Sequence, residues 1–297
     1  MTRNYSAGLR ASILSASVAL LLSACGGGGG SNSTGTLNLG ITDAPVDEAD
    51  HVWVEFTGVE IKPGGGNSFS VDFVAPRQID LLALTGGTAE LLLDGYVLDA
   101  GTYQWLRLKV NAEADSVFDS YIEIGGSQYE LRIPSGDETG LKLNRPITIP
   151  EDGTASFTID FDLRKSVHAP SGSIYILRPT LRLVDNSTAG MLSGVVDPAT
   201  IAAECVGGDA AAIYVFEGAG ATPDDVDGVD LDPVATASVD WAMGDNSYTV
   251  AFLEAGDYTA AFTCDASLDD PATDDVLSFT GTTDLTVNAG QSTPLDF

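Results

Sequence analysis

The chain has 297 residues and 44% of them are hydrophobic, which is enough apolar material to build the cores of two domains of ordinary size. It carries 43 Asp and Glu residues against 13 Lys and Arg, for a formal net charge of −30. Such an acidic surface argues against nucleic-acid binding because it repels phosphate groups; it serves either solubility or the attraction of cations.

The acidic residues are unevenly placed along the chain. Residues 36–187 hold 11 basic and 23 acidic side chains, whereas residues 188–297 hold 20 acidic side chains and no Lys or Arg. A compositional shift of this size predicts a boundary near Asn186–Gly190, with one domain over 36–187 and a more acidic domain over 188–297.

Residues 1–24 have the features of a signal peptide. Two arginines precede an apolar stretch, Ile13–Leu22, which is too short to span a bilayer but suits a signal-peptide core. The segment that follows, Leu22-Ser23-Ala24-Cys25, resembles the bacterial lipobox, in which the cysteine thiol takes a diacylglycerol and the leader is cleaved. The resemblance implies lipid attachment at Cys25. A plain secretory leader with a chance cysteine is the alternative.

Residues 25–35 are predicted to be the lipidated cysteine and a flexible linker. Glycines run from Gly26 to Gly30 and small polar residues follow, so the segment packs no core and reaches about 17–19 Å over ten residues. By analogy with lipoprotein sorting in Gram-negative cells, Gly26 in place of Asp favours the outer membrane. We therefore expect a membrane partner, reached through the lipid, on the periplasmic or surface side.

In the first domain, apolar residues alternate with polar ones, which is the period of strands. The alternation runs through Leu37–Ile41 and Val52–Phe56, and then Val59 and Ile61 take up the opposite parity. One extra residue near Gly58 would keep all of these side chains facing the core, so we predict a β-bulge there.

A hairpin is also predicted in this domain. Tyr121–Ile124 and Gln128–Ile133 flank the dipeptide Gly125-Gly126, which is typical of a tight two-residue turn. No long stretch has the period of a helix, and a single helical turn is expected at Asp47–Asp50.

Four segments carry a resemblance to a bacterial lipoprotein family known as domain of unknown function 4382. Two of them resemble the opening of that family and two its closing strands: Thr42–Asp47, Val52–Val59, Asp160–Ser166 and Leu177–Arg182. The resemblance covers about half of the chain. It implies a β-sandwich and an envelope address, and it implies no activity.

The second domain is also predicted to consist of strands. Alternating stretches occur at Ala212–Phe216, Ser247–Phe252, Tyr258–Cys264 and Leu285–Val287. Their order resembles the small transthyretin-like or carboxypeptidase-regulatory-like sandwiches. Cys205 and Cys264 are expected to form a disulfide, as suits an exported chain, with two buried thiols or a metal pair as the alternatives.

One pattern occurs in both domains. Leu98–Tyr103 and Leu253–Tyr258 each place a glycine and then a tyrosine after a turn into a strand. Such a tyrosine can tie its hydroxyl group to the backbone at a sandwich corner, so Tyr103 and Tyr258 are interpreted as structural. The fold class predicted is therefore all-β, with two Greek-key-like sandwiches.

Catalytic motifs are weak in this sequence. The two histidines, His51 and His168, accompany neither a G-x-S-x-G nor a H-E-x-x-H motif, so we expect no catalytic histidine. Asp160 and Asp162 share one face of a predicted strand, about 6–7 Å apart, a spacing that would suit glycosidase chemistry. With 43 acidic residues such pairs arise by chance, and an exposed polar face is the favoured interpretation.

An Asp-rich loop is the best candidate for a cation site, because carboxylate oxygens are the ligands that Ca²⁺ prefers. Its acidic residues are Asp224, Asp225, Asp227, Asp230 and Asp232. The loop departs from an EF-hand, since Pro223 and Val234 would occupy the first and last ligand positions. A solvated acidic loop is the alternative, and no other cofactor is expected.

Trp53 and Trp105 lie out of phase with the core residues beside them. Exposed aromatic rings can stack on sugars or mark a partner surface, but packing against the other domain is the favoured interpretation. The sequence as a whole favours a non-catalytic, lipid-anchored envelope protein that serves as a binding or structural module, with envelope proteins or glycans as its partners. A Ca²⁺-dependent or glycan-binding adhesion module comes second, and a carboxylate hydrolase third.

Overall fold

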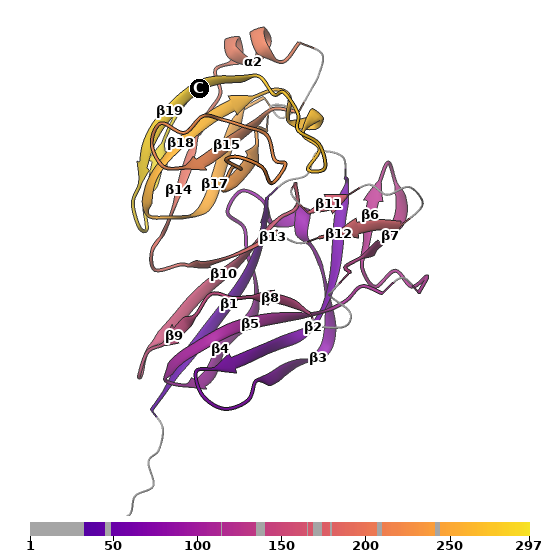
Figure 1. Ribbon diagram of the computed structural model, residues 1–297, viewed down its shortest axis with the longest axis vertical. Coiled ribbons are helices and arrows are strands. Elements are labelled where there is room, and N and C mark those ends of the chain that lie inside the picture. The colour runs from indigo at the N-terminus through magenta and orange to yellow at the C-terminus, as the bar shows by residue number, and fades with distance from the viewer. Residues whose placement is uncertain are drawn as a thin grey trace, which may run out of the picture. The chain divides into compact units, whose positions relative to one another are not determined.

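The computed structural model describes residues 33–44, 49–113, 115–134, 140–164, 166–168, 174–178, 180–206, 210–240 and 244–297. Residues 33–297 form one compact unit that is built almost entirely of strands (Figure 1). The predicted all-β sandwich class is confirmed. The leader, Cys25 and residues 47 and 48 of the helical turn expected at Asp47–Asp50 lie outside the described residues. Within the described ranges, no helix is long and apolar enough to cross a membrane.

The first two sheets enclose one core. The first sheet has the order β13-β10-β1-β4, in which β1 is parallel to β10 and antiparallel to β4. Its strands are β1 (Thr34–Ala44), β4 (Glu90–Asp99), β10 (Thr154–Asp162) and β13 (Thr180–Asp185). The second sheet has the order β11-β12-β7-β6-β2-β5-β8, and β3 and β9 pair with β2 and β5. Its strands are β2 (His51–Pro63), β3 (Phe69–Asp80), β5 (Gly101–Asn111), β6 (Tyr121–Ile124), β7 (Ser127–Arg132), β8 (Leu141–Leu143), β9 (Ile147–Ile149), β11 (Val167–His168) and β12 (Ile174–Leu177).

The predicted bulge in β2 is confirmed. The pairing of β2 with both β3 and β5 shifts register between Phe56 and Gly58. A Cβ atom on Gly58 would lie 2.5 Å from the carbonyl oxygen of Val71, so only glycine fits there. The extra residue lets Val59 and Ile61 join Phe56 in the core although their parity differs.

The predicted hairpin is also confirmed. Strands β6 and β7 are joined by Gly125 and Gly126, whose φ angles are +57° and +74°. Positive φ at both central residues is the conformation that glycine adopts without a steric penalty. A short 3₁₀ helix, η1 (Leu81–Leu84), follows β3 and buries two leucines in the same core.

The last two sheets enclose a second core. One sheet has the order β17-β14-β20 and the other β16-β15-β18-β19. Their strands are β14 (Ala189–Val195), β15 (Ala212–Glu217), β16 (Ala235–Ser238), β17 (Ser247–Glu254), β18 (Gly256–Thr263), β19 (Phe279–Val287) and β20 (Ser292–Pro294). In chain order, Leu183 is the last buried residue of the first core, and Leu192 is the first buried residue of the second core. The division of the chain into two domains stays a prediction.

Two short helices in the described part of this region were not predicted from the sequence. Helix α2 (Pro198–Glu204) begins at the cap residue Asp197, whose carboxylate accepts a hydrogen bond from the backbone N–H of Ala199. The 3₁₀ helix η2 (Ala266–Leu268) follows β18. The residue after α2 is Cys205, which forms the predicted disulfide with Cys264; their Cα atoms are 5.1 Å apart.

Both tyrosine corners are present. The hydroxyl group of Tyr103 donates to the carbonyl oxygen of Asp99 at 2.9 Å, and that of Tyr258 donates to Glu254 at 2.7 Å. Each ring is buried, and each bond spans four residues across the turn into its strand. The shared sequence pattern therefore has the structural role predicted for it.

Candidate functional site

Aspartate carboxylates gather at one place beside β15. One oxygen from each of Asp225, Asp227 and Asp274 lies within 4.8 Å of the others, and the same holds for Asp225, Asp269 and Asp275. Asp225 belongs to both groups and is buried, with 1% of its surface exposed. We call these five residues the aspartate cluster.

The aspartate cluster differs from the predicted site. Of the predicted residues only Asp225 and Asp227 belong to it. Asp232 accepts a hydrogen bond from the backbone of Gly228, Asp224 accepts one from the next residue, and Asp230 lies outside both groups. Three members were not predicted from the sequence, and they follow the loop by about 40 residues: Asp269, Asp274 and Asp275.

Hydrogen bonds fix the inner part of the aspartate cluster. A carboxylate oxygen of Asp225 accepts from the backbone N–H of Asp275 at 2.6 Å. Asp269 accepts from the N–H of Val226 at 3.0 Å and from the hydroxyl group of Tyr214. Burial raises the pKa of both Asp225 and Asp269 above the ordinary range. Oxygens arranged in this way suit a hard cation such as Ca²⁺.

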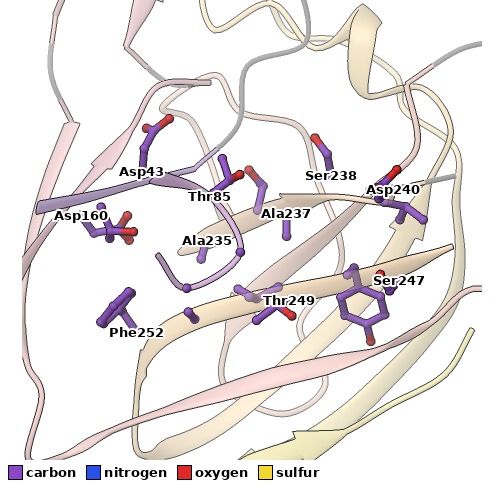
Figure 2. A pocket seen from close by; sticks show the side chains of 18 residues that line it. Asp43, Thr85, Asp160, Ala235, Ala237, Ser238, Asp240, Ser247, Thr249 and Phe252 are labelled. Atoms are coloured by element: carbon purple, nitrogen blue, oxygen red, sulfur yellow. The ribbon is translucent and has the colours of Figure 1, made fainter. Parts of the chain in front are cut away.

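A cavity of about 540 Å³ lies between β16, β17, the strands β1 and β10 of the first sheet, and the loop that follows η1 (Figure 2). Its walls come from five segments of the chain, and no pattern in the sequence indicated it. The lining residues are Thr42, Asp43, Thr85, Gly86, Gly87, Asp160, Ala235, Thr236, Ala237, Ser238, Val239, Asp240, Ser247, Tyr248, Thr249, Val250, Ala251 and Phe252. A volume of this size is typical of ligand sites.

The interpretation of Asp160 and Asp162 as an exposed polar face is wrong. Both side chains are buried, because β10 lies inside its sheet and this part of the strand is covered. Asp160 forms an ion pair with Arg182 on the neighbouring strand β13 and lines the cavity. Burial raises the pKa of the Asp160 carboxyl, and the Arg182 guanidinium opposes that rise.

His51 lies at the start of β2, beside Asp80. Its Nδ1 atom is 2.7 Å from a carboxylate oxygen of Asp80, and the other oxygen accepts from the backbone N–H of Val52. The hydrogen bond to Asp80 raises the pKa of the imidazole. This pair ties the beginning of β2 to the end of β3. The side chain of His168 lies outside the described part of the structure.

The two candidate tryptophans have ring contacts within their own sheet. The ring of Trp53 is stacked with the ring of Tyr121, and the two ring centroids are 6.2 Å apart. The guanidinium group of Arg107 lies 4.7 Å from the centre of the Trp105 ring, and the ammonium group of Lys142 lies 4.8 Å from it. Each indole is half-buried, so a ligand face at Trp53 or Trp105 stays a prediction.

Comparison with protein families gives one match. The model described as "Domain of unknown function (DUF4382)" matches residues 34–179, which agrees with the resemblance found in the sequence and assigns no activity. No curated protein matches the chain. The transthyretin-like resemblance of the second domain stays a prediction.

Solved structures share only a distant similarity with this chain. The TIE protein of Bacillus anthracis is 11% identical over 89% of the chain, with a TM-score of 0.22, and the chain spans 34% of its length. The minor pilin GBS52 of Streptococcus agalactiae is 10% identical over 88% of the chain and 94% of the pilin, with a TM-score of 0.21. The major pilin subunit BcpA of Bacillus cereus, in a variant form, is 10% identical over 89% of the chain and 99% of the subunit, with a TM-score of 0.21.

Proposed function

We propose that this protein is a non-catalytic, lipid-anchored envelope protein whose acidic all-β body serves as a binding or structural module at the outer membrane. The observation that carries the proposal is the order of features at the start of the chain: charged leader, short apolar core, the lipobox-like Leu22–Cys25 and a glycine tether. The first strand begins at Thr34, so eight residues lie between it and Cys25 and leave room for a membrane surface.

The environment of the candidate catalytic groups supports a non-catalytic role. Asp160, the best-placed carboxylate of the hydrolase alternative, is buried against Arg182, and the His51 imidazole is held by Asp80. Each of the two groups is engaged by a side chain on the neighbouring strand, which disfavours its use as a general acid or base. A broad panel of glycoside, ester and peptide substrates should therefore show no turnover.

The anchor is tested by metabolic labelling with a palmitate analogue and by membrane fractionation. The natural chain should take the label and sediment with outer membranes, whereas Cys25→Ser should lose the label and enter the soluble fraction. Cys205→Ser is the matched control, because it removes a cysteine that the anchor does not use. Equal labelling of the natural chain and Cys25→Ser would refute the proposal.

A second function, calcium-dependent adhesion, is favoured by the aspartate cluster. Asp225 is almost fully buried among other carboxylates, residues 188–297 contain no Lys or Arg, and Arg164 from the preceding part of the chain acts on Asp269. A divalent cation would offset the repulsion and the lost hydration of these groups. Calcium-dependent melting of the purified protein tests this assignment.

A further inference from the structure

The cavity opens where two strands part from each other. A single bridge joins Asp240 to Ser247, and from there β16 continues as the last strand of one sheet while β17 continues as the last strand of another. In the described part of the chain, each of these two strands pairs with a neighbouring strand on one side only, apart from that bridge. Two sheet edges therefore line one cavity (Figure 2).

A sheet edge presents a row of backbone N–H and C=O groups that can pair with another strand. Ser247 to Phe252 of β17 line the cavity, and the regular part of the strand, Ser247 to Val250, extends along roughly 13 Å at about 3.3 Å per residue. A small sugar could satisfy only a few groups of such a row. An extended peptide matches its length and its alternation of donors and acceptors.

A buried hydroxyl group on the opposite wall also lacks a partner. Thr236 in β16 is 4% exposed, and its Oγ1 atom has no hydrogen-bond partner within the described structure. Buried polar groups in native proteins are nearly always paired, so a group of this kind in a cavity wall points to a ligand that completes the bond. A backbone or side-chain group of a bound peptide would do so.

The charge of the cavity selects the kind of peptide. Figure 2 shows Asp43 and Asp160 at one end and Asp240 at the other, and none of the lining residues that the structure describes is Lys or Arg. Asp160 forms an ion pair with Arg182, and the chain as a whole carries a net charge of −30. An anionic cavity in an anionic protein attracts basic groups and repels acidic ones.

We propose that this cavity binds an extended, basic segment of a partner protein, which adds as a strand to the free edge of β17 and bonds to Thr236 across the cavity. The inference rests on the proposed role as a binding module and gives that role a site and a ligand class. It is independent of the lipid on Cys25.

The test uses the purified full-length protein in detergent and an array of acetylated hexapeptides. Lys, Gln or Glu occupies the third position, and the other positions vary among Thr, Val, Ile and Tyr. We expect binding by Lys peptides, at least tenfold weaker binding by the matched Glu peptides, and loss of binding when alternate backbone nitrogens of the best peptide are methylated. Binding that ignores both charge and methylation would overturn the proposal, as would an array without any bound member.

Amino-acid substitutions then test whether the peptide binds in this cavity. Thr249→Trp fills the cavity from β17 and should weaken the best peptide at least tenfold, whereas Thr282→Trp, at an exposed position on β19, should leave binding unchanged. Thr236→Val keeps the shape of the side chain and removes its hydroxyl group, so it tests the same site if Thr249→Trp does not fold. Unchanged binding in the folded cavity variants, or saccharide binding in the cavity without any peptide binding, would overturn the inference. Membrane fractionation of the same preparation reports separately on the anchor.

Discussion

Arg145 and Glu254, which are 109 residues apart in the chain, form an ion pair that joins the first core region to the acidic second one. The same guanidinium group donates to the carbonyl oxygen of Leu183, and the backbone carbonyl of Glu254 accepts the hydroxyl group of Tyr258. Arg164 makes a second such contact, donating at 2.8 Å to the carbonyl oxygen of Ala266. Because residues 188–297 lack Lys and Arg, these cationic contacts come from the preceding part of the chain.

The ion pair predicts a small, salt-dependent coupling. Both side chains are about two-fifths exposed, so the coupling between Arg145→Gln and Glu254→Gln should be about 0.2–1 kcal/mol in low salt. It should shrink in 1 M NaCl, where screening acts within a few ångströms. Urea unfolding of the two single variants and the double variant measures this coupling. A coupling that is equal at both salt concentrations would contradict an electrostatic origin.

The tyrosine corners predict a matched pair of stability losses. Tyr103→Phe and Tyr258→Phe each remove one hydrogen bond and leave a backbone carbonyl without its partner, so each should lower the free energy of unfolding by about 1 kcal/mol. Tyr96→Phe, at a half-buried ring that packs against the first core, should change it by less than about 0.5 kcal/mol. Denaturant unfolding compares the three variants, and equal stability of all of them would count against the corners.

The disulfide predicts a larger loss. Cys205 and Cys264 close a loop with a sequence separation of 59, which on the chain-entropy model stabilises the fold by about 4 kcal/mol as an upper value. Cys205→Ala combined with Cys264→Ala should lower the melting temperature to the value that reduction gives the natural chain. Two free thiols in the exported protein would show that the bond does not form.

In the absence of calcium, the carboxyl groups of the aspartate cluster should make the folded protein more stable at acidic pH than at neutral pH. Burial raises the folded-state pKa of Asp225 and Asp269 above 3.8, so their contribution to stability is complete below about pH 4 and is lost as the pH rises through the raised pKa values. Asp225→Asn should therefore stabilise the protein at pH 7 in the presence of a chelator. Chemical unfolding between pH 4 and pH 7 measures the effect.

Asp284 provides the control of opposite sign. The backbone N–H of Gly220 and the hydroxyl group of Thr259 donate to its carboxylate and lower its pKa. Its contribution is present above about pH 4 and is lost as the pH falls through the lowered pKa. Asp284→Asn should thus destabilise the protein at pH 7. The same sign for both substitutions would contradict the assignment of the two environments.

Calcium should raise the melting temperature if the aspartate cluster binds it, because a ligand that binds only the folded state stabilises that state. Removal with a chelator should reverse the rise, and Asp227→Asn combined with Asp274→Asn should abolish it. Asp230→Asn, in the same loop but outside the cluster, is the matched control. No change in melting temperature at millimolar calcium would end the calcium proposal.

The sequence predicted best what depends on neighbours along the chain. Alternation located the strands and the parity change located the bulge at Gly58, because both follow from the two-residue period of a strand. The tyrosine corners were visible because the donor and the acceptor are four residues apart. Helix α2 was missed because seven residues are too few to show a helical period.

The candidate sites depended on contacts that no local pattern records. Asp269, Asp274 and Asp275 approach Asp225 only through the fold, and high acidic content hides such a convergence among many chance pairs. Asp160 looked exposed because its strand alternates, yet tertiary packing covers that face. The cavity itself needs five segments and two sheet edges to be brought together.

The position of β1 determines how the body would respond to mechanical force. The strand begins at Thr34, at the point where the chain enters the folded body, and it lies between β10 and β4 instead of at an edge. Nine residues of β1 pair in parallel with β10, and its other side pairs with β4. A pull on the preceding segment along the strand axis would load two hydrogen-bond ladders in shear at once. Such a geometry resists extension far better than one in which bonds open one after another, as in a zipper.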